Sequence, residues 1–339
     1  MNEVNKKTYL VRRDLESPVR GFVYDEKIDN AYTKHFKYVP EDRRLLSFAL
    51  DNVSMTSDCY LLYAVAHMGV ADKDSISLFL QALSNKYPAL NIVYEKTPDA
   101  IEGRLRLLAK MGYLFCFRYM KTVVVNGIAS DNMISLYTVV AGAYDVVKQR
   151  LQKRLNINAA IQYKPIGELI GWASAAYTGA CIAISSNHFV DFLERVLRTK
   201  QLGAFYFPVE LKTVVEEVPY YIAVMSSYLY RDDKIHTETD YAQNCAFKIN
   251  AIKNYLSCRT QKGVAIVVVT VADNDDLMEI SSLIYKSEIL KPYLEQIYFT
   301  GEGVLKERAG NAAECFLQMR IDYEEEIGYR FEYTPPVFL

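Results

Sequence analysis

Residues 97–119 read TPDAIEGRLRLLAKMGYLFCFRY, and this stretch decides the fold that we expect. Thr97 is a hydroxyl residue of the kind that caps a helix N-terminus, and the proline after it suits the first helical position. Ile101, Leu105 and Leu108 then recur at the spacing of one helix face, and Gly112 ends the pattern. This spacing puts Asp99, Gly103, Arg106 and Lys110 on the opposite face. The segment Tyr113–Tyr119 alternates as a strand does, so a strand is predicted directly after this helix.

The segments on either side add two helices and a second strand. They are predicted at Thr56–Met68, Asp74–Lys86 and Ile134–Val139. The turn pair Asn126-Gly127 lies in the connection between the two strands, which are therefore expected to form a hairpin. Three helices followed by a hairpin is the order of a winged helix-turn-helix. We assign this domain to residues 41–155, with residues 1–40 as an N-terminal arm.

The rest of the chain, residues 156–339, predicts a mixed α/β domain. Its clearest elements are a helix of small and apolar residues, a long helix and a continuously apolar central strand, at Ile166–Ser185, Thr239–Leu256 and Val264–Val271. Other patterns predict helices at Asn187–Arg198 and Asp275–Lys286, and strands at Ala204–Val215, Tyr220–Tyr230 and Gln296–Thr300. The expected fold class is α+β, an N-terminal winged helix-turn-helix followed by a mixed α/β domain.

Composition narrows the function classes. The net charge is −2, so any nucleic-acid contact must come from a local basic surface. The six cysteines show no CxxC spacing and the four histidines are dispersed, which argues against a zinc site and indicates reduced, mostly buried thiols. The N-terminus lacks an apolar signal segment, and Glu168 interrupts the apolar run Ile166–Ser185. We expect a soluble cytoplasmic protein with no metal, cofactor, small-molecule ligand or membrane contact.

Cations gather around the third helix and the first strand. Five cations and no acid lie between Arg104 and Lys121, which is the local excess that phosphate neutralisation requires. A second basic segment, Ala143–Leu155, is predicted as a helix that could extend the same footprint. The predicted DNA-binding residues are Thr97, Arg104, Arg106, Lys110, Arg118, Lys121, Lys148, Arg150, Lys153 and Arg154. Asp99 and Glu102, at the start of the helix, would repel phosphates, so a protein–protein interaction module is a competing interpretation.

An enzymatic alternative rests on Glu210 and Lys212. A Glu-x-Lys pair on a strand belongs to Mg²⁺-dependent nucleases, in which two carboxylates hold the metal and the lysine positions the attacking water. The same spacing also arises by chance on amphipathic strands. No aspartate lies clearly on a neighbouring predicted strand, so chance is favoured and no catalytic residue is assigned.

Four stretches carry a resemblance to a known family: Tyr60–Met111, the phrase LRLLAKMGYL at 105–114, Leu136–Asp145, and Gly263–Val271 with the aspartates at 273, 275 and 276. In these stretches the chain resembles the replication-relaxation type of winged-helix proteins of bacterial plasmids and integrative elements. Such proteins join an N-terminal winged helix to a restriction-endonuclease-like domain. The resemblance implies a DNA-binding protein of a mobile element, acting in replication, transfer or transcriptional control. It also implies a degenerate nuclease domain, because Met225, Ser226 and Ser227 stand where acidic residues are expected.

Small residues recur every four positions in the helix Ile166–Ser185. They are Gly167, Gly171, Ala175, Gly179 and Ala183. Such a stripe allows another helix or a sheet to approach closely. Together with the pairing of helix-turn-helix domains on palindromic sites, it suggests a homodimer on double-stranded DNA.

Overall fold

The computed structural model describes most of the chain from residue 57 onward. The described residues are 57–88, 97–111, 113–125, 128–139, 166–186, 195–199, 203–207, 209–227, 238–259, 263–271, 277, 281–282, 284–307, 312–321, 329–336 and 338–339. The predicted arm (1–40) and the predicted basic helix (143–155) lie outside them. The described residues form an α+β structure, with N-terminal helices and a hairpin followed by a six-stranded mixed sheet with flanking helices.

The described part of the N-terminal unit consists of three helices and a two-stranded hairpin, in the order expected from the sequence. Its elements are α3 (Ser57–Met68), α4 (Lys73–Lys86), α5 (Pro98–Lys110), β1 (Leu114–Val125) and β2 (Ile128–Val139). The two strands are antiparallel, and their register runs from Leu114 opposite Val139 to Val125 opposite Ile128. Both strands are longer than predicted, because residues expected in the connection continue β1 to Val125 and begin β2 at Ile128.

Side-chain caps set the beginnings of two helices. The Asp72 carboxylate accepts a hydrogen bond from the Ser75 backbone N–H at 2.8 Å and so caps α4. The Thr97 hydroxyl accepts one from the Ala100 N–H at 3.3 Å and caps α5. Each cap satisfies a donor that the first helical turn leaves without a partner in the helix. The cap predicted at Thr97 is confirmed.

A β-bridge ties the helices to the hairpin. The Ala71 N–H donates to the Tyr137 carbonyl at 3.1 Å, and the Tyr137 N–H donates to the Ala71 carbonyl at 2.9 Å. Ala71 lies between α3 and α4, so this segment pairs with β2 as a single-residue third strand. Both residues are fully buried. The bridge therefore fixes the hairpin against the helical core.

The C-terminal unit is built on a six-stranded sheet in the order β10-β9-β8-β7-β6-β5. Strands β6, β7 and β8 are parallel, and the outer strands pair antiparallel. The strands are β5 (Val209–Val215), β6 (Val218–Ser226), β7 (Val264–Val271), β8 (Ile297–Gly301), β9 (Leu317–Ile321) and β10 (Tyr329–Tyr333). The predicted central strand is confirmed as β7, which has a parallel neighbour on each side.

A separate hairpin corrects one sequence prediction. Strands β3 (Arg195–Thr199) and β4 (Gly203–Phe207) pair antiparallel with each other. The helix predicted at 187–198 is therefore wrong for residues 195–198, and residues 187–194 lie outside the described ranges. Val196 lies opposite Tyr206 and Arg198 opposite Ala204. A helical interpretation of the apolar spacing overlooked this cross-strand pairing.

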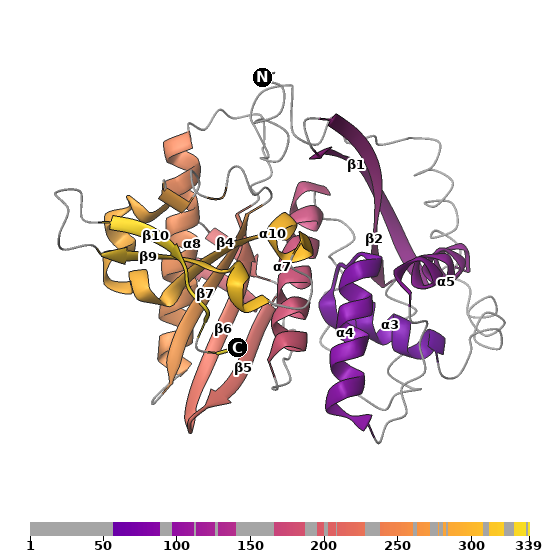
Figure 1. The fold of residues 1–339 in the computed structure, drawn as a ribbon, viewed down its shortest axis with the longest axis horizontal. Coiled ribbons are helices and arrows are strands. Elements are labelled where there is room, and N and C mark those ends of the chain that lie inside the picture. The colour runs from indigo at the N-terminus through magenta and orange to yellow at the C-terminus, as the bar shows by residue number, and fades with distance from the viewer. Residues whose placement is uncertain are drawn as a thin grey trace.

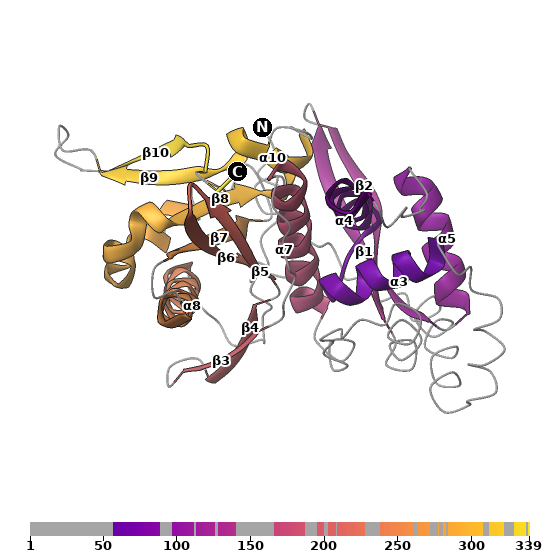
Figure 2. The same cartoon turned by 90° about the horizontal axis from the view of Figure 1, so that it is seen from below.

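Helices cover both faces of the sheet (Figure 1). They are α7 (Ile166–Ser185), α8 (Glu238–Arg259), the 3₁₀ helix η4 (Glu288–Gln296), the short α10 (Glu302–Glu307) and the 3₁₀ turn η5 (Ala312–Cys315). Helix α7 packs against β5, β6 and β7, whereas α8 packs against β7 and η4. Seen from below, α7 and α8 lie on opposite sides of the sheet (Figure 2).

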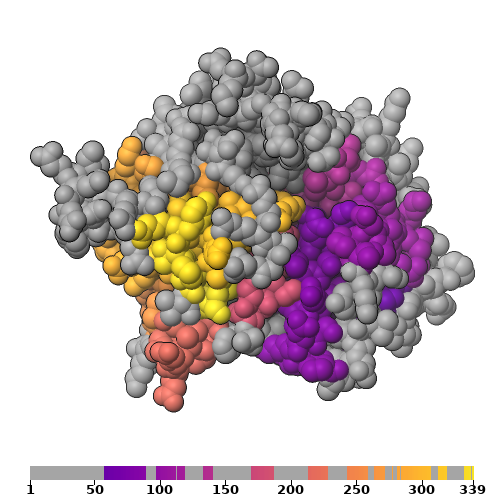
Figure 3. All heavy atoms as spheres, in the orientation of Figure 1, coloured from indigo at the N-terminus to yellow at the C-terminus, as the bar shows by residue number. Residues whose placement is uncertain are grey.

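Helix α7 joins the two units. It packs on α4 of the N-terminal unit as well as on the sheet, and the two views agree on this placement (Figures 1 and 2). Its described side chains are buried up to Ala183, and in the space-filling view only a small patch of α7 shows between its neighbours (Figure 3). The small-residue stripe lies on a helix enclosed by its own chain. The small-residue stripe therefore no longer supports homodimerisation, which stays a prediction.

The structure also tests the expectations about buried cysteines and about a membrane-spanning helix. Cys258 is exposed and the other five cysteines are buried, which confirms the prediction of mostly buried cysteines. Within the described ranges, every helix is too short or too polar to cross a bilayer. The apolar run predicted at Ile166–Ser185 is α7, buried inside the protein.

Candidate nucleic-acid interface

Helix α5 has a buried side and an exposed side. Ile101, Leu105 and Leu108 are fully buried, as their spacing predicted. Asp99, Gly103, Arg106, Leu107 and Lys110 are exposed, and we call these five residues the outward face of α5. A Cβ atom at Gly103 would meet nothing within 4 Å. The outward face is therefore open enough for another molecule to approach the helix backbone there.

Arg104 has an internal partner. Its Nε and Nη2 atoms donate to the two carboxylate oxygens of Asp58, which lies in the first turn of α3 and is fully buried. A paired, bidentate arginine compensates for the cost of burying that carboxylate. Arg104 therefore links α5 to α3, and its charge is already neutralised inside the protein. This weakens its assignment as a DNA contact.

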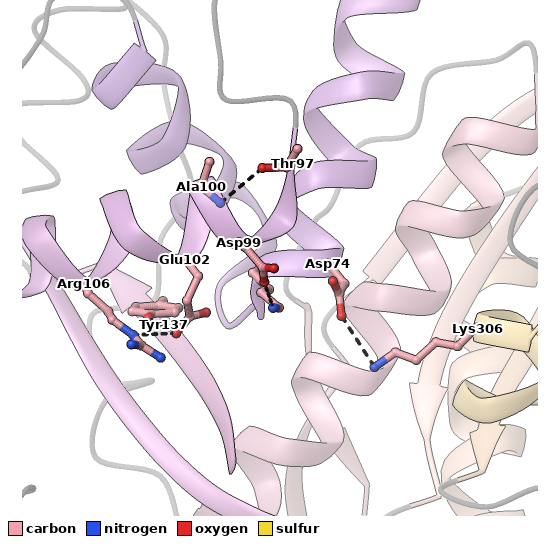
Figure 4. A network of polar contacts seen from close by, with 9 residues as sticks. Asp74, Thr97, Asp99, Ala100, Glu102, Arg106, Tyr137 and Lys306 are labelled. Atoms are coloured by element: carbon pink, nitrogen blue, oxygen red, sulfur yellow. Dashed lines mark hydrogen bonds and ion pairs between the residues drawn. The ribbon is translucent and has the colours of Figure 1, made fainter. Parts of the chain in front are cut away.

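Arg106 belongs to a network that reaches into the core. Its Nε donates to Glu102 Oε1 at 3.0 Å, and the Tyr137 hydroxyl donates to the same oxygen at 2.8 Å (Figure 4). The Tyr137 residue is fully buried, the Glu102 side chain is 13% exposed and the Arg106 side chain is 52% exposed. Burial, with Cys116 and Glu102 nearby, raises the pKa of Tyr137, so its hydroxyl keeps its proton and remains a donor.

Asp99, the acid on the outward face, is also paired. Lys73, at the start of α4, donates a hydrogen bond to Asp99. This bond lowers the pKa of Asp99 below its usual value. Asp99 and Glu102, which the sequence suggested would repel phosphates, are therefore each offset by a cation. Lys110 is exposed at the end of α5 and adds positive charge to the same face.

The hairpin contributes Arg118 next to this face. Alternate residues of a strand share a side, so Arg118 lies on the same side of β1 as Cys116. Cys116 pairs across the hairpin with Tyr137, the residue that contacts Glu102. Arg118 is half-buried. Arg106 thus contacts the Glu102–Tyr137 pair directly, and Arg118 lies two residues along β1 from Cys116, the cross-strand partner of Tyr137. Sequence reasoning alone did not connect these residues.

Several of the predicted DNA-binding residues have side chains outside the described part of the structure. Lys121 lies in β1 opposite Asn132, but its side chain is outside the described part of the structure. Lys148, Arg150, Lys153 and Arg154 lie in the undescribed range 140–165. Thr97 is exposed and its hydroxyl caps α5, which gives it a structural role at the helix start.

Among the residues that the structure describes, the nuclease alternative gains no second carboxylate. Glu210 and Lys212 lie on β5, an edge strand, opposite Ala223 and Tyr221 of β6. Strand β6 has no acidic residue along its length, and the side chains of Glu210 and Lys212 are outside the description. Among the described residues, no group of three potential metal ligands is present. The pair therefore stays a weak alternative.

A second charged network lies away from α5, where α4, α7 and α10 meet. Lys306 Nζ of α10 lies 2.7 Å from Glu302, 3.9 Å from Asp74 and 4.0 Å from Asp72. It also lies over the Tyr177 ring of α7, 5.1 Å from its centroid. Burial acts to lower the pKa of Lys306, but the three carboxylates outweigh it and raise that pKa. We call these five residues the junction network; Figure 4 shows its contact between Asp74 and Lys306.

Sequence reasoning missed the junction network because its members are far apart in the chain. Asp72 caps α4, and Glu302 follows β8 directly, so each has an ordinary local explanation. Comparison with known proteins adds no assignment to either network: no family model, no curated protein and no solved structure matches the chain. What the interface does is therefore inferred from its own residues.

Proposed function

We propose that the N-terminal unit is a winged helix-turn-helix that binds double-stranded DNA, with α5 entering the major groove and the hairpin as the wing. The observation that carries this proposal is the outward face of α5, whose cations Arg106 and Lys110 are exposed. Its acid Asp99 and the neighbouring Glu102 are each paired with a cation. A helix of this kind reads base edges, and cations around it contact the phosphates.

The order of elements supports the same proposal. Three helices precede the hairpin, and the Ala71 bridge adds a short third strand beside β2. This arrangement leaves α5 at the surface next to β1. The half-buried Arg118 on β1 would supply a phosphate contact from the wing.

The process that the protein serves is proposed on sequence alone. The phrase at 105–114 and its neighbouring stretches resemble winged-helix proteins of bacterial mobile elements. On that basis we place the protein in replication, transfer or transcriptional control of such an element, as a non-catalytic DNA-binding protein. Its second domain would then serve as a scaffold for the first.

Fluorescence anisotropy with mixed-sequence duplex DNA at several salt concentrations tests the proposal. Each lost phosphate contact lowers the slope of log K against log salt by about one. The double variant Arg106→Ala/Lys110→Ala is expected to weaken duplex binding and to flatten that slope, because it removes two exposed cations from the outward face. The measurement uses the full chain.

A matched double variant controls for net charge. Lys286→Ala/Lys291→Ala also removes two exposed lysines, but from the segment around η4 in the sheet unit. It is expected to leave the salt slope unchanged. Failure of the wild-type protein to bind any duplex, or an equal loss in both double variants, would overturn the proposed interface.

A further inference from the structure

We infer that Glu102 and Tyr137 are positioning residues that hold Arg106 for sequence-specific recognition of a guanine in the major groove. This inference rests on the proposed function and adds the residue that discriminates between sequences. It is carried by the network in which Glu102 Oε1 accepts hydrogen bonds from both Arg106 Nε and the Tyr137 hydroxyl.

The network has a fixed end and an exposed end. Tyr137 is fully buried, and its backbone is held by both hydrogen bonds of the Ala71 bridge. Its hydroxyl donates a hydrogen bond to the Glu102 carboxylate, which in turn accepts one from Nε of Arg106 (Figure 4). A long arginine side chain normally loses rotamer freedom when it binds, and a partner that orients it beforehand reduces that cost.

The atoms used by Glu102 determine what Arg106 can recognise. The carboxylate takes the Nε–H, which lies near the backbone end of the guanidinium, and the two Nη groups are at the far end. Guanine presents O6 and N7 side by side in the major groove, and arginine donates to both at once. Phosphate contact needs only charge, whereas this paired contact needs orientation, so the network favours base readout.

Glu102 also has a simpler interpretation, as an acid that merely repels DNA. The two interpretations predict opposite results for Glu102→Gln. Loss of repulsion would tighten binding to every duplex and leave discrimination unchanged. Loss of positioning would reduce discrimination, because the amide is a weaker acceptor for the guanidinium than a carboxylate.

Asp99 provides the matched control. It lies on the same helix, is exposed, and is paired with Lys73 rather than with an arginine of α5. Asp99→Asn and Glu102→Gln each remove one negative charge from α5 and change the net charge equally. A difference between the two variants therefore reports the position of the carboxylate and not its charge.

The experiment starts by selecting tight duplexes from a pool with a randomised centre, using the full-length wild-type protein. The affinity of the best guanine-containing duplex is then divided by that of a scrambled duplex for each variant. Glu102→Gln is expected to lower this ratio about tenfold, within the range of one bidentate base contact, and Arg106→Ala to lower it at least as far. Tyr137→Phe, which removes only the hydroxyl, is expected to lower the ratio by less, and Asp99→Asn to leave it unchanged.

The combined variant Glu102→Gln/Arg106→Ala distinguishes positioning from a separate contact. If Glu102 acts through Arg106, adding Glu102→Gln to Arg106→Ala lowers the ratio no further. An unchanged ratio in Glu102→Gln, an equal loss in Asp99→Asn, or a wild-type protein that binds all duplexes alike would each overturn this inference while leaving duplex binding intact. No duplex binding by the wild type would instead remove the proposed function.

Discussion

The junction network and the outward face of α5 contain the same kinds of charged groups, but they differ in burial. At the junction, Glu302 is buried and Lys306 lies between carboxylates from two units of the fold. On α5, the pairs made by Asp99 and Arg106 have at least one partner in solvent. Exposed pairs contribute little to stability, whereas removing one partner of a buried pair is costly.

This difference separates residues that hold the fold from residues that can bind. At the junction, Lys306 is already shared by three carboxylates of the same chain, including that of the buried Glu302, so its charge is engaged within the fold. The cations on the outward face are exposed, so they can exchange their present partners for a phosphate or a nucleobase. Substitutions in the first region should therefore change the free energy of unfolding, and substitutions in the second should change binding.

The largest effect is expected for Arg104→Ala. This variant tests whether α5 carries a charged residue that stabilises the fold as well as charged residues that can bind a ligand. The variant leaves the fully buried Asp58 carboxyl without its arginine, so the free energy of unfolding should fall by about 3 kcal/mol. Urea unfolding followed by circular dichroism measures it. Adding Asp58→Asn should restore part of the loss. If the double variant is no more stable than the single one, the buried charge is not the cause.

The next effect is expected for Lys306→Ala at the junction. It leaves Glu302 and Asp72 without their shared cation, and we expect a loss of about 2 kcal/mol because the lysine side chain keeps some exposure. The urea midpoint should fall with little change in slope. Lys291→Ala, which removes an exposed lysine 2.7 Å from Glu288, should change stability by less than about 0.5 kcal/mol. Equal losses in the two variants would remove the distinction between the regions.

Local signals in the sequence were sufficient for much of the fold. The Thr97 cap, the proline after it and the apolar spacing predicted α5, and the continuous apolar run predicted β7. The turn between β5 and β6 lacks a local signal of this kind. It consists of Glu216 and Glu217, both with positive φ, at positions where Asn-Gly is usual. The β3–β4 hairpin was missed because its pairing competes with a helical spacing.

Only part of the candidate site could be predicted from the sequence. Spacing on one helix placed Arg106 and Lys110 on the outward face, since that follows from helix geometry. The same spacing gave no indication that Arg104 would pair with Asp58, 46 residues away, or that Tyr137 would contact Glu102 from another element. These contacts depend on tertiary packing, and they decide which arginine is available to a ligand.

The two regions should also differ in the sign of a pH effect. Burial and the neighbouring Asp72 raise the pKa of Asp74 above 3.8, so its ionised form is disfavoured in the folded protein. Stability from this group is present at low pH and is lost as pH rises through the folded pKa. Asp74→Asn should therefore be more stable than the wild type at pH 7, with the gap closing near pH 4.

Asp99 gives the opposite expectation on α5. Its hydrogen bond from Lys73 lowers its pKa, so its stabilising effect is present at neutral pH and is lost on acidification. Asp99→Asn should be slightly less stable than the wild type at pH 7, and this gap should also close at low pH. Urea midpoints at the two pH values measure both variants. The same sign of change at pH 7 in both would show that the two carboxylates do not differ as described.

The smallest change in stability is expected for Arg106→Ala, although this variant should have a large effect on binding. Its side chain is half exposed and its partner Glu102 keeps the hydrogen bond from Tyr137, so the carboxylate is not left alone. The free energy of unfolding should change by less than about 0.5 kcal/mol, as for other exposed helical pairs. Arg104, two residues earlier on the same helix, is the internal standard. A loss in Arg106→Ala comparable to that in Arg104→Ala would mean that Arg106 also holds the fold, and that the outward face of α5 is structural.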